Sequence, residues 1–107
     1  MNKWLVEFIP EAQDDRRRLD GSVRKIVDKA IDKVSTNPLP QNEGGYGKPL
    51  GSKNGVNLTG LLKVKLKSSG IRIVYQLRRE KETMKVVVIG IREDEEVYRT
   101  AEQRLKK

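Results

Sequence analysis

The chain of 107 residues contains no cysteine and no histidine. The missing cysteine excludes disulfides and thiolate metal sites. The missing histidine removes the residue that most often acts as a general base or a zinc ligand. We therefore expect neither a metal nor a cofactor, and any catalysis must rely on lysine, arginine, tyrosine or carboxylate side chains.

Long apolar runs are also missing, because none approaches the roughly 20 residues that a membrane-spanning helix needs. The N-terminal segment MNKWLVEFIPEAQDD does not have a signal-peptide profile, since acidic residues interrupt its short apolar stretch. We expect a cytoplasmic protein with no membrane partner. The length predicts a single domain over residues 1–107 with a modest core.

Positive charge is what the chain has in excess, with 23 lysines and arginines against 15 acidic residues and a net charge of +8. Such an excess favours nucleic acid, an anionic membrane surface or an acidic protein as a partner. Composition does not choose between these partners, but the placement of the charges is more informative.

Residues 63–77, KVKLKSSGIRIVYQL, hold the most informative pattern. Two alternating runs around a Ser-Ser-Gly turn predict a β-hairpin with one buried face. With a two-residue turn, the predicted register pairs Lys67 with Arg72 and Lys65 with Val74, and directly opposed residues share a face. One face is then cationic and holds Lys63, Lys65, Lys67 and Arg72. The other is apolar and holds Leu62, Val64, Leu66, Ile71, Ile73, Tyr75 and Leu77.

The remaining patterns predict the order β-α-α-β-β-β-α, an α+β fold. We expect a small, largely antiparallel four-stranded sheet, covered by an N-terminal helical hairpin and a C-terminal helix. The second helix is predicted to begin at Ser22 as its N-cap, with an apolar stripe of Val23, Ile26, Val27, Ala30, Ile31 and Val34. The expected segments are a strand over 4–9, helices over 12–19 and 22–34, an irregular loop over 36–57, a central strand over 84–91 and a helix that follows the acidic run 93–96.

A cationic hairpin face can serve RNA cleavage through the 2′-hydroxyl. That reaction needs a base for the hydroxyl proton, charge stabilisation at phosphorus and a proton for the departing 5′-oxygen. Neighbouring cations disfavour another positive charge on a lysine, so Lys65 is a candidate base or phosphate ligand. Arg72 offers a fork of donors matched to phosphate oxygens. Arg92 and Tyr98 are close enough in sequence to converge on the same cleft, where Tyr98 could stack on a base, donate a proton or orient the phosphate.

Each of these patterns also has a structural interpretation. Outward-facing lysines on a strand can simply form a solvated face, and Arg72 can pair with an acidic group. Tyr98 follows Val97 and can be a half-buried core aromatic. The acidic run 93–96 is best explained as stabilising the positive end of the last helix.

The segment KVKLKSSGIRIVYQ strongly resembles the core hairpin of RelE-type toxins of bacterial toxin–antitoxin modules. Ile91-Arg92-Glu93 and Glu96-Val97-Tyr98 resemble that family's last strand and final helix, and Tyr46-Gly47-Lys48-Pro49-Leu50 is similar to the wider RelE/ParE superfamily. The resemblance implies a small α+β toxin that cuts mRNA in the ribosomal A site without a metal. It also implies a cognate antitoxin that neutralises the toxin.

Carried over residue by residue, the resemblance assigns Lys63 and Lys65 to the catalytic lysines and Arg72 to the arginine that stabilises charge at phosphorus. Arg92 would assist the leaving group, and Tyr98 would stack on or orient the substrate. Lys67 and Lys48 are expected to bind RNA. Thr59 and Asp94 depart from the family pattern and reduce the local positive charge.

Two alternatives come from other functional classes. A ParE-like toxin shares the fold but inhibits a topoisomerase without cutting RNA, and it has no need of the five catalytic candidates. A non-enzymatic basic module would bind DNA or an acidic protein. Mapping of mRNA ends after induced expression discriminates between the three hypotheses.

Overall fold

The computed structural model describes residues 3–53, 56–67, 69–91 and 94–106, with residues 52–53, 56–59 and 94–95 in backbone only. Their order is β-α-α-β-β-β-β-α, with two short 3-10 turns over Gln41–Glu43 and Arg79–Lys81. The strands are β1 (Leu5–Phe8), β2 (Lys48–Lys53), β3 (Val56–Leu66), β4 (Ile71–Arg78) and β5 (Thr83–Gly90), and the helices are α1 (Pro10–Arg17), α2 (Gly21–Val34) and α3 (Asp94–Leu105).

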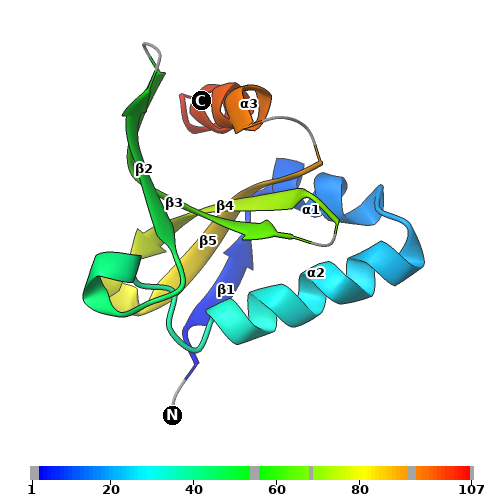
Figure 1. The fold of residues 1–107 in the computed structure, drawn as a ribbon, viewed down its shortest axis with the longest axis horizontal. Coiled ribbons are helices and arrows are strands. Elements are labelled where there is room, and N and C mark those ends of the chain that lie inside the picture. The colour runs from blue at the N-terminus through cyan, green and yellow to red at the C-terminus, as the bar shows by residue number, and fades with distance from the viewer. Residues whose placement is uncertain (1–2, 54–55, 68, 92–93, 107) are drawn as a thin grey trace.

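The five strands form one mixed sheet in the order β1-β5-β4-β3-β2. The parallel pair is β1 with β5, and the other neighbours are antiparallel. Figure 1 shows α2 and α3 on opposite sides of this sheet, with the β2–β3 hairpin reaching toward α3. The predicted α+β class is confirmed, and the predicted strand number of four is wrong by one.

The additional strand lies inside the segment that we expected to be an irregular loop over residues 36–57. Within it, Lys48–Lys53 pairs with β3, and β3 itself already begins at Val56. The sequence KPLGSK conceals this strand because proline and glycine are unfavourable in strand interiors. Pairing with a long neighbouring strand overrides the weak local preference.

The side of the sheet that α1 and α2 cover, here called the α1/α2 face, is apolar. Among the described residues its buried cluster comprises Ala12, Val27, Ile31, Val34, Leu62, Ile71, Ile73, Tyr75, Met84, Val86 and Ile89. Every residue predicted for the apolar side of the hairpin belongs to this cluster or packs against it. The alternation therefore assigned that face correctly.

The opposite side, here called the α3 face, has a second buried cluster of Leu50, Leu61, Val74, Val87, Val88, Val97, Tyr98 and Ala101. The adjacent residues Val87 and Val88 both belong to it because the pairing of β4 with β5 shifts between Val74 and Tyr75. Such a bulge places two consecutive side chains on one face. Val86 and Ile89, on either side of this pair, belong to the cluster of the α1/α2 face.

The register of the β3–β4 hairpin differs from the prediction. Lys65, and not Lys67, lies opposite Arg72, and Leu66 lies opposite Ile71. A four-residue loop over 67–70 replaces the expected two-residue turn, and in it the Gly70 N–H donates to the Leu66 carbonyl (2.8 Å). Gly70 has a φ of +73°, which favours glycine. A shift of two residues leaves each side chain that remains in the paired strands on its predicted face.

The helical hairpin is confirmed, with corrected ends. The first helix begins at Pro10, which has a backbone suited to a first helical turn. The second begins at Gly21, so Ser22 lies inside it, where its hydroxyl donates to the Asp20 carboxylate (2.9 Å). The predicted stripe is right for Val27, Ile31 and Val34, which are buried, and for Val23 and Ala30, which pack against the core; Ile26 is instead 45% exposed.

The segment between α2 and β2 is fastened to the sheet. The buried Tyr75 hydroxyl donates to the Pro38 carbonyl (2.7 Å), and burial raises the pKa of this hydroxyl above its ordinary value. A Cβ at Gly47 would collide with the same hydroxyl and with Leu62, so glycine permits this close approach.

In the described part of the chain, no helix is both long and apolar enough to cross a bilayer.

Candidate nucleic-acid interface

Four cationic side chains share the α3 face of the sheet, and we call them the cationic row: Lys48, Lys63, Lys65 and Arg72. Lys48 of β2 lies opposite Lys63 of β3, and Lys65 lies opposite Arg72 of β4. Lys63 also lies opposite Val74, which is buried beneath α3. Because directly opposed residues share a face, the row crosses three neighbouring strands on the side where α3 packs.

Lys63 is the buried member of the row, with 9% of the residue exposed. Its Nζ lies 5.4 Å from the centroid of the Tyr98 ring. This cation–π geometry is favourable where water is largely excluded. The structure thus brings together two of the predicted catalytic residues from β3 and α3.

Tyr98 is itself only 6% exposed. Its hydroxyl is buried and has no hydrogen-bond partner among the residues that the structure describes. A buried hydroxyl without a partner costs about 1–3 kcal/mol. Because the residue is buried against Lys63, the Tyr98 ring is not exposed for stacking on a base in this conformation.

Arg72 lies where three strands meet, with Lys65 opposite it on one side and Gly90 on the other. Its guanidinium donates to the Gly70 carbonyl (3.0 Å), which holds the side chain near the hairpin loop. Gly90 is the last residue of β5, so Arg72 lies beside the point where the chain leaves the sheet. Arg92, the remaining catalytic candidate, lies outside the described residues.

The other predicted site residues differ in position. Lys65 is exposed on its strand, which suits a residue that contacts a ligand. Lys67 is also exposed, but it follows the end of β3 and belongs to the loop, so the predicted place on the strand face beside Arg72 is wrong. The side chains of Thr59 and Asp94, the two departures from the family pattern, lie outside the description.

A cavity of about 280 Å³ lies beside the cationic row, and its lining consists of Gln41, Tyr46, Lys48, Lys63, Val64 and Lys65. Sequence reasoning did not assign Gln41 and Tyr46 to the site. A signal existed for Tyr46, because the YGKPL segment that carries it also contains Lys48. No pattern pointed to Gln41.

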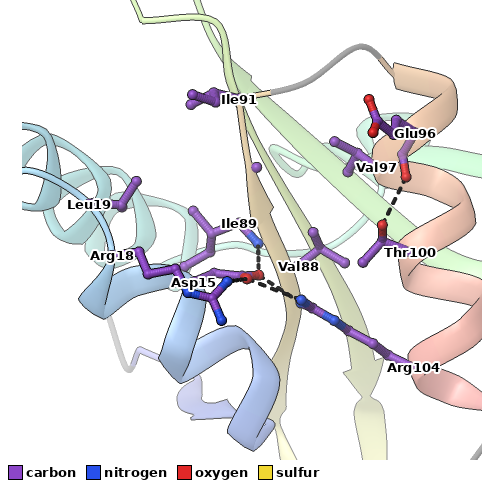
Figure 2. A pocket seen from close by; sticks show the side chains of 11 residues that line it. Asp15, Arg18, Leu19, Val88, Ile89, Ile91, Glu96, Val97, Thr100 and Arg104 are labelled. Atoms are coloured by element: carbon purple, nitrogen blue, oxygen red, sulfur yellow. Dashed lines mark hydrogen bonds and ion pairs between the residues drawn. The ribbon is translucent and has the colours of Figure 1, made fainter.

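A second feature that the sequence did not reveal is an ion pair between α1 and α3. Arg104 of α3 donates to both carboxylate oxygens of Asp15 in α1, at 2.7 and 3.0 Å, and to the Val87 carbonyl at 2.8 Å. The Ile89 N–H also donates to Asp15, at 3.0 Å. Figure 2 shows Asp15, Ile89 and Arg104 meeting at β5. They lie beside a cavity of about 430 Å³ between α1 and α3. The pair fixes the helix that carries Tyr98.

Comparison with known proteins agrees with this architecture, although no family model matches the chain. A mutant of the Escherichia coli toxin RelE in the free state has the same fold, with a TM-score of 0.72, 29% identity and coverage of 97% of this chain and 99% of that one. The E. coli RelBE toxin–antitoxin complex contains a chain with a TM-score of 0.63 and 29% identity, covering 84% of this chain and 98% of that one. The fold is thus that of a small RelE-like toxin.

The sequence defines the family. The chain is 31% identical over 102 residues to the mRNA interferase toxin RelE of E. coli K12. The aligned segment covers 95% of this chain and 97% of the relative. It belongs to the RelE family of mRNA interferase toxins. The resemblance proposed from the KVKLKSSGIRIVYQ and EVY segments is confirmed.

Proposed function

We propose that this protein is an endoribonuclease toxin that cleaves mRNA in the ribosomal A site through the 2′-hydroxyl, without a metal ion. The observation that best supports the proposal is the direct opposition of Lys65 and Arg72 on the α3 face, with Lys63 against Tyr98 beside them. The family membership of the chain supports the same function.

The proposed reaction is an attack of the 2′-oxygen on the adjacent phosphorus. Lys65, with Lys63 beside it, takes the 2′-hydroxyl proton, and the bond between phosphorus and the 5′-oxygen breaks. The departing oxygen takes up a proton from water, with Arg92 and Tyr98 assigned to assist this step, and the products are a 2′,3′-cyclic phosphate and a 5′-hydroxyl. Histidine is absent from the chain, so lysine is the remaining strong base in the row.

Arg72 is assigned to the developing negative charge on the phosphorane. Its Cβ and that of Lys65 are expected about 5 Å apart, as for any directly opposed pair. One phosphodiester can therefore contact both side chains. A preorganised donor of this kind contributes about 10²–10³-fold to a rate.

Induced expression followed by primer extension of mRNA tests the proposal. The wild type should produce breaks within codons, and Arg72→Ala should reduce them by about 10²–10³-fold. Arg78→Ala is the matched control, since Arg78 is an exposed arginine at the far end of the same strand. DNA damage with intact mRNA would instead indicate a ParE-like toxin, and neither effect would indicate a binding module.

A cognate antitoxin is the proposed partner. The net charge of +8 and the cationic row favour an antitoxin with acidic segments. Solved relatives include RelE-type toxins in complex with antitoxins. Co-expression with the product of an adjacent gene should suppress the mRNA breaks, and continued cleavage in the presence of that bound product would contradict neutralisation.

A further inference from the structure

Tyr46 is an unusual surface residue of this protein. In the part of the chain that the structure describes, it is the only aromatic among the exposed large hydrophobic residues, with 43% exposure. By contrast, Tyr75 and Tyr98 are 0% and 6% exposed. A base arriving at this surface can reach the Tyr46 ring without rearrangement of the protein, which is not true of Tyr98.

The backbone that carries Tyr46 is held in place. The Tyr46 N–H donates to the Asn37 carbonyl (3.1 Å), and the Gln41 N–H donates to the Gly47 carbonyl (2.7 Å). The buried Tyr75 hydroxyl anchors the same segment to the sheet. The ring is therefore positioned in advance, which lowers the entropic cost of binding.

The cavity beside Tyr46 combines three kinds of group that a nucleotide uses. Lys48 and Lys65 supply positive charge for phosphate oxygens, and the amide of Gln41 can both donate to and accept from a base edge. The Tyr46 ring supplies a stacking surface, and Lys33 Nζ lies 5.3 Å from its centroid. Aromatic rings within a cationic groove are typical of single-stranded nucleic acid sites.

We infer that Tyr46, Gln41 and Lys48 form a subsite that holds one unpaired RNA nucleotide, with the Tyr46 ring stacked on its base. Lys63 and Lys65 line both this cavity and the proposed cleavage site, so the nucleotide lies next to the scissile phosphate. The inference rests on the proposed function, because it assigns the nucleotide to the RNA that the cationic row engages.

Single-turnover cleavage on ribosomes programmed with a defined mRNA tests the subsite. Tyr46→Leu removes the ring and is expected to raise the half-saturating toxin concentration about 10-fold, as expected for the loss of one stacked base. Tyr46→Phe restores the ring and should recover most of that loss. Ile26→Ala is the matched control, since Ile26 is 45% exposed on α2 and lies outside the cavity lining.

Binding is measured separately with fluorescently labelled toxin carrying Arg72→Ala, on programmed and on vacant ribosomes. Weaker binding of the Tyr46→Leu form only when mRNA is present assigns the stacked base to mRNA. Equal weakening on both kinds of ribosome assigns it to ribosomal RNA. The first result supports the proposed subsite, whereas the second overturns its place next to the scissile phosphate.

The subsite is overturned if Tyr46→Leu cleaves and binds like the wild type, or if Tyr46→Phe is as weak as Tyr46→Leu. Failure of the proposed function has a different signature, in which the wild type leaves mRNA intact. In that case the binding series still decides whether Tyr46 contacts RNA.

Discussion

Among the described residues, the buried cluster between the sheet and α1 and α2 has eleven members, whereas the cluster between the sheet and α3 has eight. The α3 face also holds the cationic row, and its single helix is tied to α1 by the Asp15–Arg104 pair. Among the described residues, the larger buried apolar cluster thus lies on the α1/α2 side. The other side gives up part of its area to charged groups that a ligand can reach.

Adjacent residues of β4 show the same division at the smallest scale. Ile73 is 1% exposed and lies in the α1/α2 cluster, while Arg72 belongs to the cationic row. Because side chains alternate along a strand, one hairpin serves both purposes. Substitutions on the two faces should therefore separate stability from activity.

The largest effect on stability is expected for Asp15→Ala, on the side of α3. The side chains of Asp15 and Arg104 are 9% and 16% exposed, so the substitution leaves a largely buried guanidinium without its carboxylate. Removing one partner of a buried pair costs about 3–5 kcal/mol. Urea denaturation followed by circular dichroism measures the free energy of unfolding.

Asp14→Ala is the matched control, because the side chains of Asp14 and Arg17 are 50% and 68% exposed and lie 3.4 Å apart. Its expected cost is within about 1 kcal/mol. Equal costs for the two substitutions would show that the bridge between α1 and α3 does not stabilise the fold more than a surface pair does.

Ile73→Ala on the α1/α2 face is expected to lower the free energy of unfolding slightly less than Asp15→Ala. Truncating a buried isoleucine costs about 2–5 kcal/mol, because it removes buried surface and leaves a cavity. Ile91→Ala should stay within about 0.5 kcal/mol, since Ile91 is 68% exposed. Thermal and urea denaturation of these two variants and of Arg72→Ala measures the free energy of unfolding. The proposed division between the two faces would be refuted if Arg72→Ala were the least stable of the three.

The smallest effect on stability is expected for the ion pair between Arg16 of α1 and Asp28 of α2. The Arg16 guanidinium and the Asp28 carboxylate oxygen lie 2.6 Å apart. Hydrogen bonding from Arg16 lowers the pKa of Asp28 in the folded protein. The stabilisation is therefore fully present above the unfolded value of about 3.9, and it is lost as pH falls through the lower folded value.

Because the two side chains are 31% and 42% exposed, this contribution should be only about 0.5 kcal/mol. Unfolding free energies between pH 6 and pH 2 should fall less steeply for Asp28→Asn than for the wild type. Parallel curves for the two proteins would contradict the contribution of this pair.

Much of the fold was predictable because it is encoded in local periodicity. The stripe through Val27, Ile31 and Val34 and the alternation through Ile71, Ile73 and Tyr75 both correspond to buried faces. Strand β2 was not predictable, since its proline and glycine argue against a strand and only pairing with β3 stabilises it. The bulge at Val87 and Val88 likewise depends on how two strands fit together.

The candidate site shows the same limit. The shared face of Lys63, Lys65 and Arg72 followed from alternation, and the closeness of Tyr98 to Lys63 agrees with the predicted convergence. The partner of Arg72 was predicted wrongly, because the loop length sets the register and several loop lengths preserve the alternation. The positions of Tyr46 and Gln41 beside the lysines depend on a loop that only tertiary contacts hold in place.

The amino-acid sequence alone determined which side of the sheet each hairpin residue occupies, and with it the separation of the cations from the apolar core. This follows because, in a strand without a bulge, a side chain's face depends only on whether its position is odd or even. The tertiary structure decided which cation lies opposite Arg72, which helix covers Lys63 and which ring lies beside the cationic row. These are contacts between residues far apart in the chain, and local periodicity contains no information about them.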